Sequence, residues 1–396
     1  MYQVVKLENV IEYISRGVTP AYAEEGITVL NQKCIRDHRI LLEEARKTDP
    51  VVKRIPEDKF IKHSDVLINS TGVGTLGRVA QNKRRDLEAT VDGHVTIVRP
   101  DAKKVNGSYF GYALISVEGL IERMGEGATG QTELSRQRLK EVEIPLPTIK
   151  IQQKIAAILS AYDDLIENNL RRIKILEEMA QNLYREWFVK FRFPGHQKVK
   201  MVDSPLGKIP EGWEVLDVTN IVERHSPGKL YDQKTVYAGG SVPVLDQGRS
   251  GVIGYHNDAP GLEGSEENPV IIFANHTCYQ RIIHFPFSAI QNVIPFYPNP
   301  EKYRNIYWLH YATKDLISFS DYKGHWPEYM RKKVVVPSPQ VAEEFGNYIK
   351  ENILLCFKLQ KKCKNLSGTR DLLLPKLISG ELDVSKLDIA IPEANA

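Results

Sequence analysis

Cysteine is scarce in this chain of 396 residues, which has only Cys34, Cys278, Cys356 and Cys363. The four form no Cys-x-x-Cys pair and have no histidine at metal-ligand spacing, so neither a disulfide framework nor a zinc site is predicted. No run approaches the roughly 20 apolar residues of a membrane-spanning helix, and the N-terminus lacks a basic stretch followed by an apolar core. We therefore expect a cytoplasmic protein without a membrane segment.

Excess charge of one sign is also missing. The 53 Lys and Arg residues against 50 Asp and Glu residues give a net charge of +3, which neither requires nor excludes a nucleic-acid partner. Any nucleic-acid surface must therefore come from local clustering of basic side chains. Hydrophobic residues make up 42% of the chain, too many for a disordered protein, and the length corresponds to about two to three domains.

Catalytic signatures are absent as well. The chain has no phosphate-binding Gly-x-x-x-x-Gly-Lys-Ser/Thr loop, no Asn/Asp-Pro-Pro-aromatic tetrapeptide, no Gly-x-Ser-x-Gly elbow and no His-Glu-x-x-His helix. Residues 72–77 (GVGTLG) fit the dinucleotide fingerprint, but residues 78–86 turn polar and basic instead of opening an apolar-faced helix. This pattern favours a flexible loop between strands; a nucleotide-dependent oxidoreductase is the alternative. We expect no enzymatic activity, no metal site and no cofactor in this chain.

What the chain does contain is a long-period repeat. A β-branched stretch ending at Pro147 runs into a long helical pattern, and a second such stretch ending at Pro337 does the same, at an offset of 190 residues. The openings of the two halves also resemble each other, with YQVVKLENVI at residues 2–11 and WEVLDVTNIV at residues 213–222. One structural unit is thus encoded twice.

Both helical patterns carry an apolar seam with alternating spacings of four and three residues. Each helix spans roughly 40 residues, or about 60 Å at 1.5 Å per residue. Because a lone helix would leave this narrow seam exposed, we predict that the two copies pair within the chain as an antiparallel coiled coil; an oligomerisation helix is the alternative. The predicted seam residues are Ile155, Leu159, Tyr162, Ile166, Ile173, Leu176, Leu183, Phe345, Ile349, Leu359, Leu366 and Leu373.

The segments that precede the helices mix short β-branched strands, Gly, Pro and Asn turns and short helical stretches, which predicts an α+β fold with a pseudo-two-fold repeat. The expected strands include residues 65–69, 94–99, 269–275 and 289–296, and the expected short helices include residues 109–121 and 303–312. The predicted division is two globular parts at residues 1–147 and 197–338, long helices at residues 148–196 and 339–384, and a tail at residues 385–396.

This layout resembles the specificity (S) subunit of type I restriction-modification systems, and three stretches strengthen the resemblance. Residues 16–20 (RGVTP) with Tyr22 look like the opening of that family's target recognition domains. Residues 144–147 (IPLP) followed by 152–155 (QQKI) look like its central conserved region, and residues 370–384 look like its C-terminal conserved region. The second half departs from this pattern, because VPSP at residues 336–339 replaces IPLP and the Gln-Gln pair is missing.

The resemblance implies that each globular part, as a target recognition domain, reads one half of a split, asymmetric site in double-stranded DNA. It implies further that the helices set the gap and dock two methyltransferase (M) subunits, with restriction (R) subunits added outside, and that S-adenosylmethionine and ATP are bound by these partners. Two readers on one face of B-DNA must lie about one turn, roughly 34 Å, or a multiple of it apart. A coiled-coil adaptor that only organises proteins, without specific DNA binding, is the alternative function.

The candidate DNA contacts are basic, amide and hydroxyl side chains in Gly-rich or basic loops, because Arg and Lys contact phosphates or guanine, and Asn and Gln can pair with adenine. The candidates are Arg16, Thr19, Lys33, Thr71, Arg78, Arg84, Arg85, Gln131, Ser135 and Arg136 in the first part, and Lys229, Gln247, Arg249, Asn275, His276, Lys323 and His325 in the second.

Overall fold

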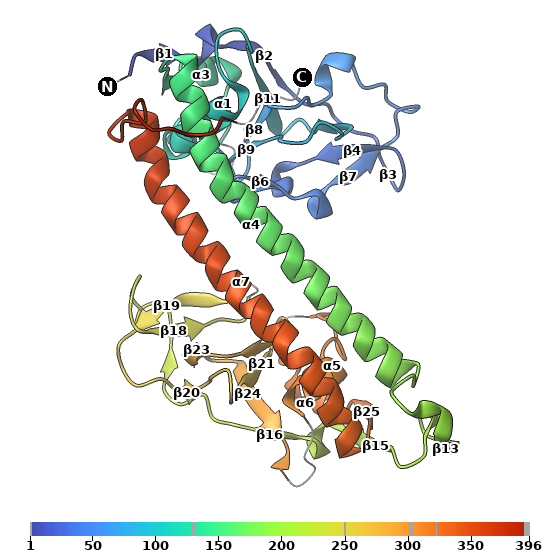
Figure 1. Ribbon diagram of the computed structural model, residues 1–396. Helices are drawn as coiled ribbons and strands as arrows, with labels where there is room; N and C mark the ends of the chain where they lie inside the picture. Colours follow the sequence, from blue (N-terminus) through green and yellow to red (C-terminus); the bar gives the residue numbers. More distant parts are fainter. Residues whose placement is uncertain (1, 128–131, 249–250, 301–304, 322, 392–396) are drawn as a thin grey trace. The chain divides into compact units, whose positions relative to one another are not determined.

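The computed structural model describes residues 2–127, 132–248, 251–300, 305–321 and 323–391 (Figure 1). The chain divides into two compact units, unit 1 with Met1–Glu167 and Cys363–Ala396, and unit 2 with Asn168–Lys362. Each unit combines a globular part with one portion of each long helix, and each is described by itself. The five-segment division expected from the sequence stays a prediction.

The globular part of unit 1 is built around an antiparallel four-stranded sheet in the order β2-β11-β8-β9. Its strands are β2 Ile11–Arg16, β11 Val95–Pro100, β8 Val66–Asn69 and β9 Val79–Gln81. A second sheet has the order β10-β4-β7-β3, with β10 Ala89–Val91, β4 Ile27–Leu30, β7 Arg46–Thr48 and β3 Tyr22–Ala23. A hairpin of β5 Ile35–Arg36 and β6 Arg39–Ile40 and a pair of β1 Val4–Lys6 with β12 Glu143–Pro145 complete the strands of this part. The helices are α1 Gly107–Ser116, α2 Glu118–Arg123 and α3 Arg136–Lys140.

Unit 2 contains the corresponding four-stranded antiparallel sheet, in the order β16-β24-β21-β22. Its strands are β16 Val222–Arg224, β24 Val293–Pro298, β21 Val270–Ala274 and β22 Gln280–Ile283. A second sheet contains β17 Leu230–Tyr231, β23 Pro286–Ile290, β18 Val242–Leu245, β19 Val252–His256 and β20 Leu262–Glu263. The remaining elements are the hairpin β13 Met201–Ser204 and β14 Gly207–Pro210, the pair β15 Glu214–Asp217 and β25 Lys333–Val336, and the helices α5 Ile306–Thr313 and α6 Trp326–Met330.

The predicted repeat is visible in individual hydrogen bonds. Leu7 N donates to the Val142 carbonyl at 2.7 Å in unit 1, and Val218 N donates to the Lys332 carbonyl at 2.9 Å in unit 2. Helices α1 and α5 both begin after an asparagine whose side chain accepts a backbone N–H of the first turn. The 190-residue offset holds from α3 and α6 through β12 and β25. The α+β class and the pseudo-two-fold repeat are therefore confirmed.

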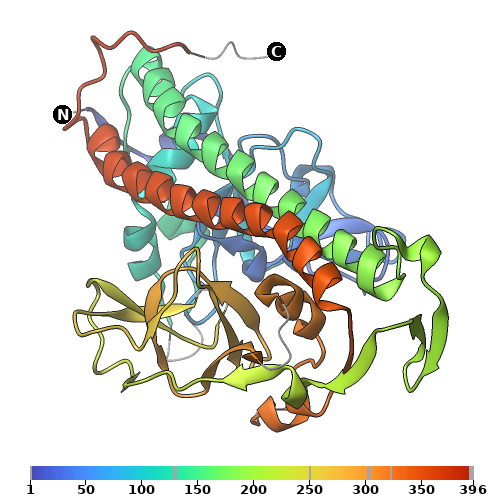
Figure 2. The same ribbon diagram turned by 60° about the horizontal axis from the view of Figure 1, so that its bottom comes forward.

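The two long helices are α4 Ile149–Tyr184 and α7 Pro339–Ser379. Within unit 1, the Cys363 sulfur lies 3.8 Å from the Ile166 carbonyl oxygen, and within unit 2 the Cys356 sulfur lies 3.9 Å from the Ile173 carbonyl oxygen. A step of seven residues forward along α4 thus matches a step of seven backward along α7, which confirms an antiparallel pair (Figures 1 and 2).

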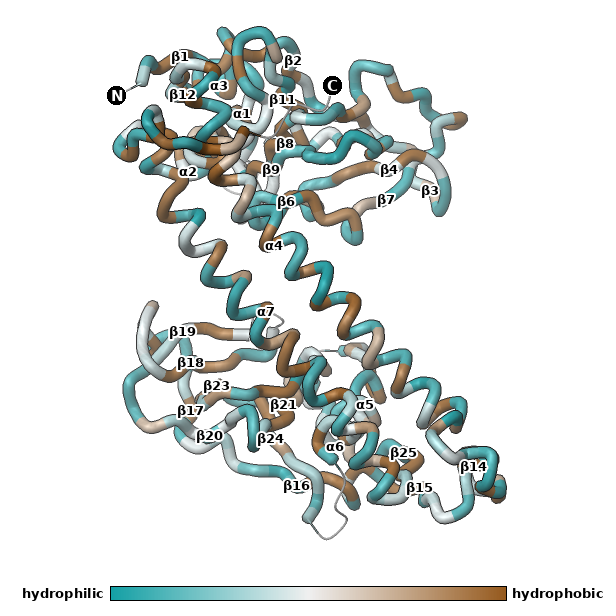
Figure 3. Tube along the Cα trace, in the orientation of Figure 1, coloured by the Kyte–Doolittle hydropathy of each residue, from teal (hydrophilic) through white to brown (hydrophobic). Residues whose placement is uncertain are grey.

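The structure buries or half-buries all twelve predicted seam residues. Hydrophobic and hydrophilic residues alternate along both helices (Figure 3), as in an amphipathic helix. Ile173 packs with Cys356 and Leu359 between the helices of unit 2. Toward the start of α7 the seam meets the globular part instead, because the Phe345 ring lies 6.1 Å from that of Tyr311 on α5. The seam residues therefore serve both the helix pair and its attachment.

The start of α4 is tied to the globular part of unit 1 by Gln152, which is 1% exposed. Its side-chain oxygen accepts from Asn106 N at 2.8 Å, and its side-chain nitrogen donates to the Pro147 carbonyl at 2.7 Å. Next to it, Lys154 Nζ donates to the Ser385 carbonyl at 2.8 Å, so the segment after α7 returns to the start of α4. The Gln-Gln-Lys stretch thus fixes the junction of three chain segments.

Two expected elements are wrong in extent. Residues 289–296 do not form one strand, because β23 ends at Ile290 and β24 starts at Val293 after a turn in which Asn292 has φ 69°. Residues 109–121 are divided between α1 and α2 at Val117, whose φ and ψ are not helical. Gln291 and Asn292 stand at the first break, and Ser116, Glu118 and Gly119 surround the second, so polar and glycine residues mark both places in the sequence.

Candidate nucleic-acid interface

One end of the four-stranded sheet of unit 1 brings Arg16, Ser135 and Arg136 together in a polar pocket of about 630 Å³. Arg16 closes β2, and Ser135 caps α3 by accepting from Arg138 N at 3.2 Å. The loop before α3 is fixed to the sheet because Leu134 N donates to the Ser70 carbonyl at 2.8 Å. We call the residues that line this pocket, together with Thr71, the first loop cluster; the lining residues are Ile14, Arg16, Glu133, Ser135, Arg136, Gln137 and Lys140.

Arg16 is the most firmly oriented cation of the first loop cluster. One guanidinium nitrogen lies 2.7 Å from Glu133 Oε1, another donates to the Leu134 carbonyl at 2.9 Å, and the side chain is 25% exposed. Arg136 and Lys140 add two further positive charges against the single carboxylate of Glu133. A pocket with this excess of cations favours an anionic ligand such as a phosphate group.

Thr71 lies at the edge of the same cluster. It forms an isolated bridge with Glu133, and its hydroxyl lies 2.7 Å from His94 Nδ1. The loop that follows it, residues 72–77, joins β8 to β9, which pair antiparallel, and Gly77 N donates to the Asn69 carbonyl at 2.8 Å. No helix opens after the glycines, so the geometry excludes the dinucleotide-binding alternative and confirms a loop between strands.

In unit 2, the loop after β21 brings Gln247, Asn275, His276 and Lys323 together, and we call these residues the second loop cluster. His276 N donates to Gln247 Oε1 at 2.8 Å, and His276 Nδ1 lies 3.0 Å from the Lys323 carbonyl oxygen. Asn275 Oδ1 accepts from Trp326 N at 2.8 Å. The amides of Gln247 and Asn275 and the imidazole of His276 are thus gathered beside the Lys323 backbone, while the Lys323 ammonium lies 3.6 Å from Asp321 Oδ2. Amide and imidazole groups belong to the donor and acceptor set that reads base edges and phosphates.

The two loop clusters occupy corresponding places in their units. In unit 1 the segment before α3 donates from Leu134 N to the carbonyl of Ser70, the first residue after β8. In unit 2 the segment before α6 donates from His325 N to the carbonyl of Asn275, the first residue after β21, at 3.0 Å. The same end of the same sheet therefore carries a polar loop cluster in both copies.

The other candidates lie elsewhere or are engaged. Thr19 and Lys33 are exposed, and the Arg78 guanidinium donates to the Gly74 carbonyl at 2.9 Å. Lys229 lies 2.7 Å from Asp258 Oδ2 and is not among the residues of the second loop cluster. Arg84 and Arg85 are exposed, and Arg84 lines a separate pocket beside the long helices. Gln131 and Arg249 lie outside the described residues.

His325 requires a correction, because the sequence pattern placed it on the surface. Its side chain is fully buried, and Nε2 lies 3.1 Å from the Asp321 carbonyl oxygen. The neighbouring Trp326 ring packs 5.7 Å from Phe273, which draws the start of α6 into the core. In this structure His325 is a buried residue that supports the loop after β21.

Sequence reasoning missed Gln137, Lys140 and Arg281. The first two lie on α3, whose five residues are too few to show helical periodicity. Arg281 lies on β22 and donates to the Gly251 carbonyl at 2.9 Å; burial lowers the pKa of its guanidinium from the ordinary value. Among the residues that the structure describes, no carboxylate lies within ion-pair distance of Arg281. Only the fold places these groups next to the predicted loops.

The described part of the chain has no helix that is long and apolar enough to cross a membrane. It also holds no group of three or more His, Cys, Asp or Glu side chains placed to bind a metal ion, as far as residues 2–127, 132–248, 251–300, 305–321 and 323–391 are concerned.

Two corresponding polar loop clusters on repeated α+β parts, joined by paired helices, define a protein that recognises a polyanion such as DNA.

Comparison with known proteins gives similarities to one family. Residues 2–178 match the family model of the type I restriction modification DNA specificity domain. The type I restriction enzyme MjaIX specificity subunit of Methanocaldococcus jannaschii is 27% identical over 365 residues, which cover 86% of this chain and 82% of that protein. The EcoR124I/EcoR124II specificity subunit of Escherichia coli is 27% identical over 150 residues, which cover 36% of this chain and 37% of that protein.

The fold is also that of a solved relative. The crystal structure of a type I restriction-modification S subunit from M. genitalium covers 96% of both chains with a TM-score of 0.58 at 18% identity. The chain is therefore similar to the specificity subunits of type I restriction-modification systems, in sequence over most of its length and in fold. The matched family is a DNA specificity domain and the relatives are named as specificity subunits, so the comparisons give no support to an adaptor without DNA recognition.

Proposed function

We propose that each loop cluster reads one half of a split, asymmetric DNA site, the first through unit 1 and the second through unit 2. The observation that carries this proposal is the correspondence of the two clusters, each placed at the same end of its sheet by a backbone hydrogen bond to the first residue after the strand, with the donor shifted by one residue between the copies. Their side chains differ, with Arg16, Ser135 and Arg136 in one and Gln247, Asn275 and His276 in the other. Equivalent positions with different donors and acceptors suit two halves with different sequences.

The proposal extends to the helices, which would set the spacer and dock two M subunits, with R subunits added outside. At 1.5 Å per residue, α4 with its 36 residues has a length of about 54 Å, which exceeds one turn of B-DNA. Ile175 and Met179 support docking, because they lie one turn apart on α4 and are 48% and 54% exposed. The chain itself would hold no cofactor, with S-adenosylmethionine and ATP on the partner subunits in the cytoplasm.

The test is to co-express the chain with its methyltransferase subunit and map methylated adenines. A split motif is expected, and exchange of residues 1–147 for those of a relative should change only one half of it. Arg16→Ala should weaken reading of that half, and Gln247→Ala should weaken reading of the other. Methylation of an unsplit motif, or simultaneous change of both halves, contradicts the proposal.

Docking has its own test. Ile175→Lys combined with Met179→Lys should abolish co-purification of the methyltransferase, while the control Glu178→Lys, also exposed on α4, should leave it intact. Undiminished co-purification by the double variant would remove α4 as the docking surface.

A further inference from the structure

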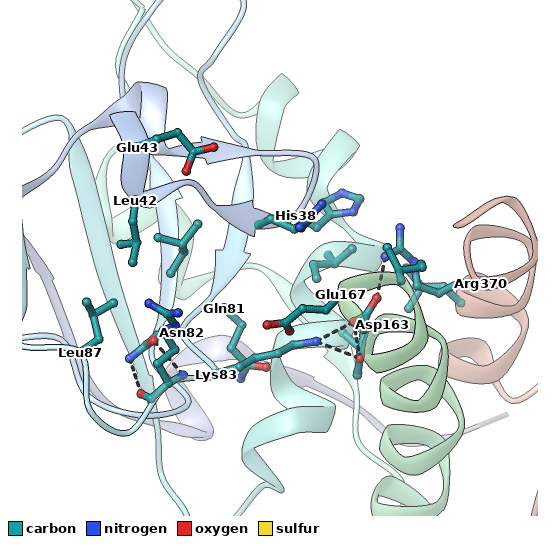
Figure 4. Close-up of a pocket in the computed structure, with 17 residues that line it drawn as sticks. His38, Leu42, Glu43, Gln81, Asn82, Lys83, Leu87, Asp163, Glu167 and Arg370 are labelled. Carbon is teal, nitrogen blue, oxygen red and sulfur yellow. Dashed lines mark hydrogen bonds and ion pairs between the residues drawn. The ribbon is translucent and has the colours of Figure 1, made fainter. Parts of the chain in front are cut away.

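The attachment of the globular part of unit 1 to its long helices differs from that of unit 2. In unit 1 a pocket of about 340 Å³ lies between the strand-following loops and the helices, lined by Lys83, Tyr112, Asp163, Glu167 and Arg370 among others (Figure 4). All of these residues belong to unit 1. The attachment is therefore partly open and lined by charged groups.

Asp163, on α4, is the centre of this attachment. Its Oδ2 lies 2.6 Å from Lys83 Nζ and accepts the Tyr112 hydroxyl at 2.6 Å, while its Oδ1 accepts from Arg370 Nη1 at 2.6 Å (Figure 4). Lys83 and Tyr112 come from the globular part and Arg370 comes from α7. One carboxylate thus joins the globular part to both helices. The Asp163 side chain is 18% exposed and that of Arg370 is 14% exposed, so water screens this ion pair only in part.

The position of Lys83 is fixed by its neighbour. Asn82 Oδ1 accepts from Arg84 N at 3.1 Å, and Asn82 Nδ2 donates to the Lys62 carbonyl at 3.0 Å. This clamp holds the turn after β9 with the Lys83 side chain directed at Asp163 (Figure 4). The link from sheet to helix is therefore short and rigid on the side of the sheet.

The repeat shows what stands at the corresponding positions of unit 2. The 190-residue offset matches Asp163 with Ile353 and Glu167 with Phe357, and both of these side chains are apolar. The strand register matches Lys83 with His284, whose ring lies 5.7 Å from that of Phe357. An aromatic contact therefore fills the place that is an open, ionic pocket in unit 1.

The tyrosines at matching positions of α1 and α5 also differ in their contacts between the two units. Tyr112 and Tyr311 are each the sixth residue after the capping asparagine of α1 and α5. Tyr112 donates to Asp163, whereas the Tyr311 ring lies 6.0 Å from Tyr184 and 6.1 Å from Phe345. At this place unit 2 has a packed aromatic cluster, whereas unit 1 has a single carboxylate with three donors. Nearer the start of α4, unit 1 is also attached by Gln152 and by a buried apolar core that includes Ile155 and Leu159.

We infer that Asp163 is a positioning residue that fixes the angle of the first recognition part on the helix pair and thereby limits the spacer lengths that the protein accepts. The inference rests on the proposed reading of a split site. Inserting one base pair displaces a half-site by about 3.4 Å and rotates it by about 35° around the DNA axis. The apolar core and Gln152 hold the recognition part near the start of α4, and the three short bonds to Asp163 hold it at a second point further along the helix. Two points of attachment fix an angle, so the part cannot follow this rotation, whereas loss of the second point lets it tilt about the first.

The experiment measures methylation by the complex with its methyltransferase on duplexes whose spacer is the native length or one base pair longer or shorter. Asp163→Asn should lower the preference for the native spacer at least about fivefold, with a smaller change in the rate on the native duplex. Lys83→Met removes the link to the sheet while the pair between Asp163 and Arg370 remains, and should act in the same direction. Asp164→Asn is the matched control, because Asp164 is the exposed neighbour on α4.

An unchanged spacer preference in both variants overturns the inference. An equal loss of methylation at every spacer length also overturns it, because that result indicates lost stability without a change of angle. If Asp163→Asn does not fold, Lys83→Met decides the question alone, since Lys83 is 46% exposed. Failure of the wild-type complex to methylate any split site would instead refute the proposed function.

Discussion

Arg16 provides a direct test of the first loop cluster. Arg16→Ala removes one of the three cations of the pocket. It also removes the guanidinium that lies 2.7 Å from Glu133 Oε1 in the wild-type protein. The excess of positive charge in the pocket falls from two to one. Loss of one charge-assisted phosphate contact should weaken DNA binding about tenfold, or about 1.4 kcal/mol. Each phosphate contact contributes about 0.9 to the slope of log affinity against log salt concentration. The ratio of the affinity at about 50 mM salt to that at about 200 mM salt should therefore be about 3.5-fold smaller in the variant.

The assay is fluorescence anisotropy of the complex on a labelled duplex that contains the mapped site, at several salt concentrations. Glu133→Gln should act in the opposite direction, because it raises the excess charge while Arg16 keeps its bond to the Leu134 carbonyl. Lys174→Ala is the control, since Lys174 is an exposed cation on α4. An unchanged affinity and salt slope in Arg16→Ala would refute the role of the pocket. Weakening by Glu133→Gln would show that Glu133 orients Arg16 and does not screen it.

Three further predictions concern stability. Asp65→Ala leaves the Arg99 guanidinium, bonded to both Asp65 oxygens at 2.8 and 2.7 Å, buried without its partner, and should cost about 3–5 kcal/mol in chemical denaturation; a loss below about 1 kcal/mol contradicts this. Asn169→Leu removes a buried side-chain nitrogen that has no hydrogen-bond partner among the described residues, and should raise the melting temperature. Burial lowers the pKa of His284 to about 4 and of His310 to about 3. Unfolded histidines, with a pKa near 6.5, then bind protons that the folded ones do not, so stability is complete above about pH 6.5 and falls by about 1.4 kcal/mol per histidine and pH unit toward pH 4. Stability that rises on acidification from pH 6.5 would contradict this assignment.

The long helices were predictable because their signal is local and repeated. Matching Pro147 with Pro337 places the starts of the two helical patterns 190 residues apart, and α4 and α7 begin at Ile149 and Pro339. Regular seam spacing over many turns outweighs single exceptions such as Asn169, so both the helices and their pairing follow from sequence. The strands were found approximately, since β-branched runs mark them even where a turn divides a run.

The polar clusters were only partly predictable, because they depend on contacts between distant residues. Arg16 was a candidate from its loop, but its partner Glu133 lies 117 residues further along the chain, and no local pattern connects them. The sequence pattern misplaced His325 for the same reason, since its burial depends on the packing of Trp326, at the start of α6, against Phe273 in the distant strand β21. Composition identifies which side chains suit DNA, whereas strand pairing determines which of them share a surface.

The asymmetry between the units explains why a repeated chain need not recognise a symmetric site. The backbone frame is conserved between the copies down to matched hydrogen bonds, so both loop clusters occupy the same place in their units. The copies differ at the loop cluster and at the attachment to the helices, among other places such as their second sheets. Where unit 1 has Asp163 and Glu167, unit 2 has Ile353 and Phe357. An ionic contact in one copy thus corresponds to an aromatic contact in the other, and none of these four residues belongs to the seam cluster around Ile173. Sequence change at the clusters can therefore alter what each half reads, while change at the attachments can alter the spacing at which both halves are read together.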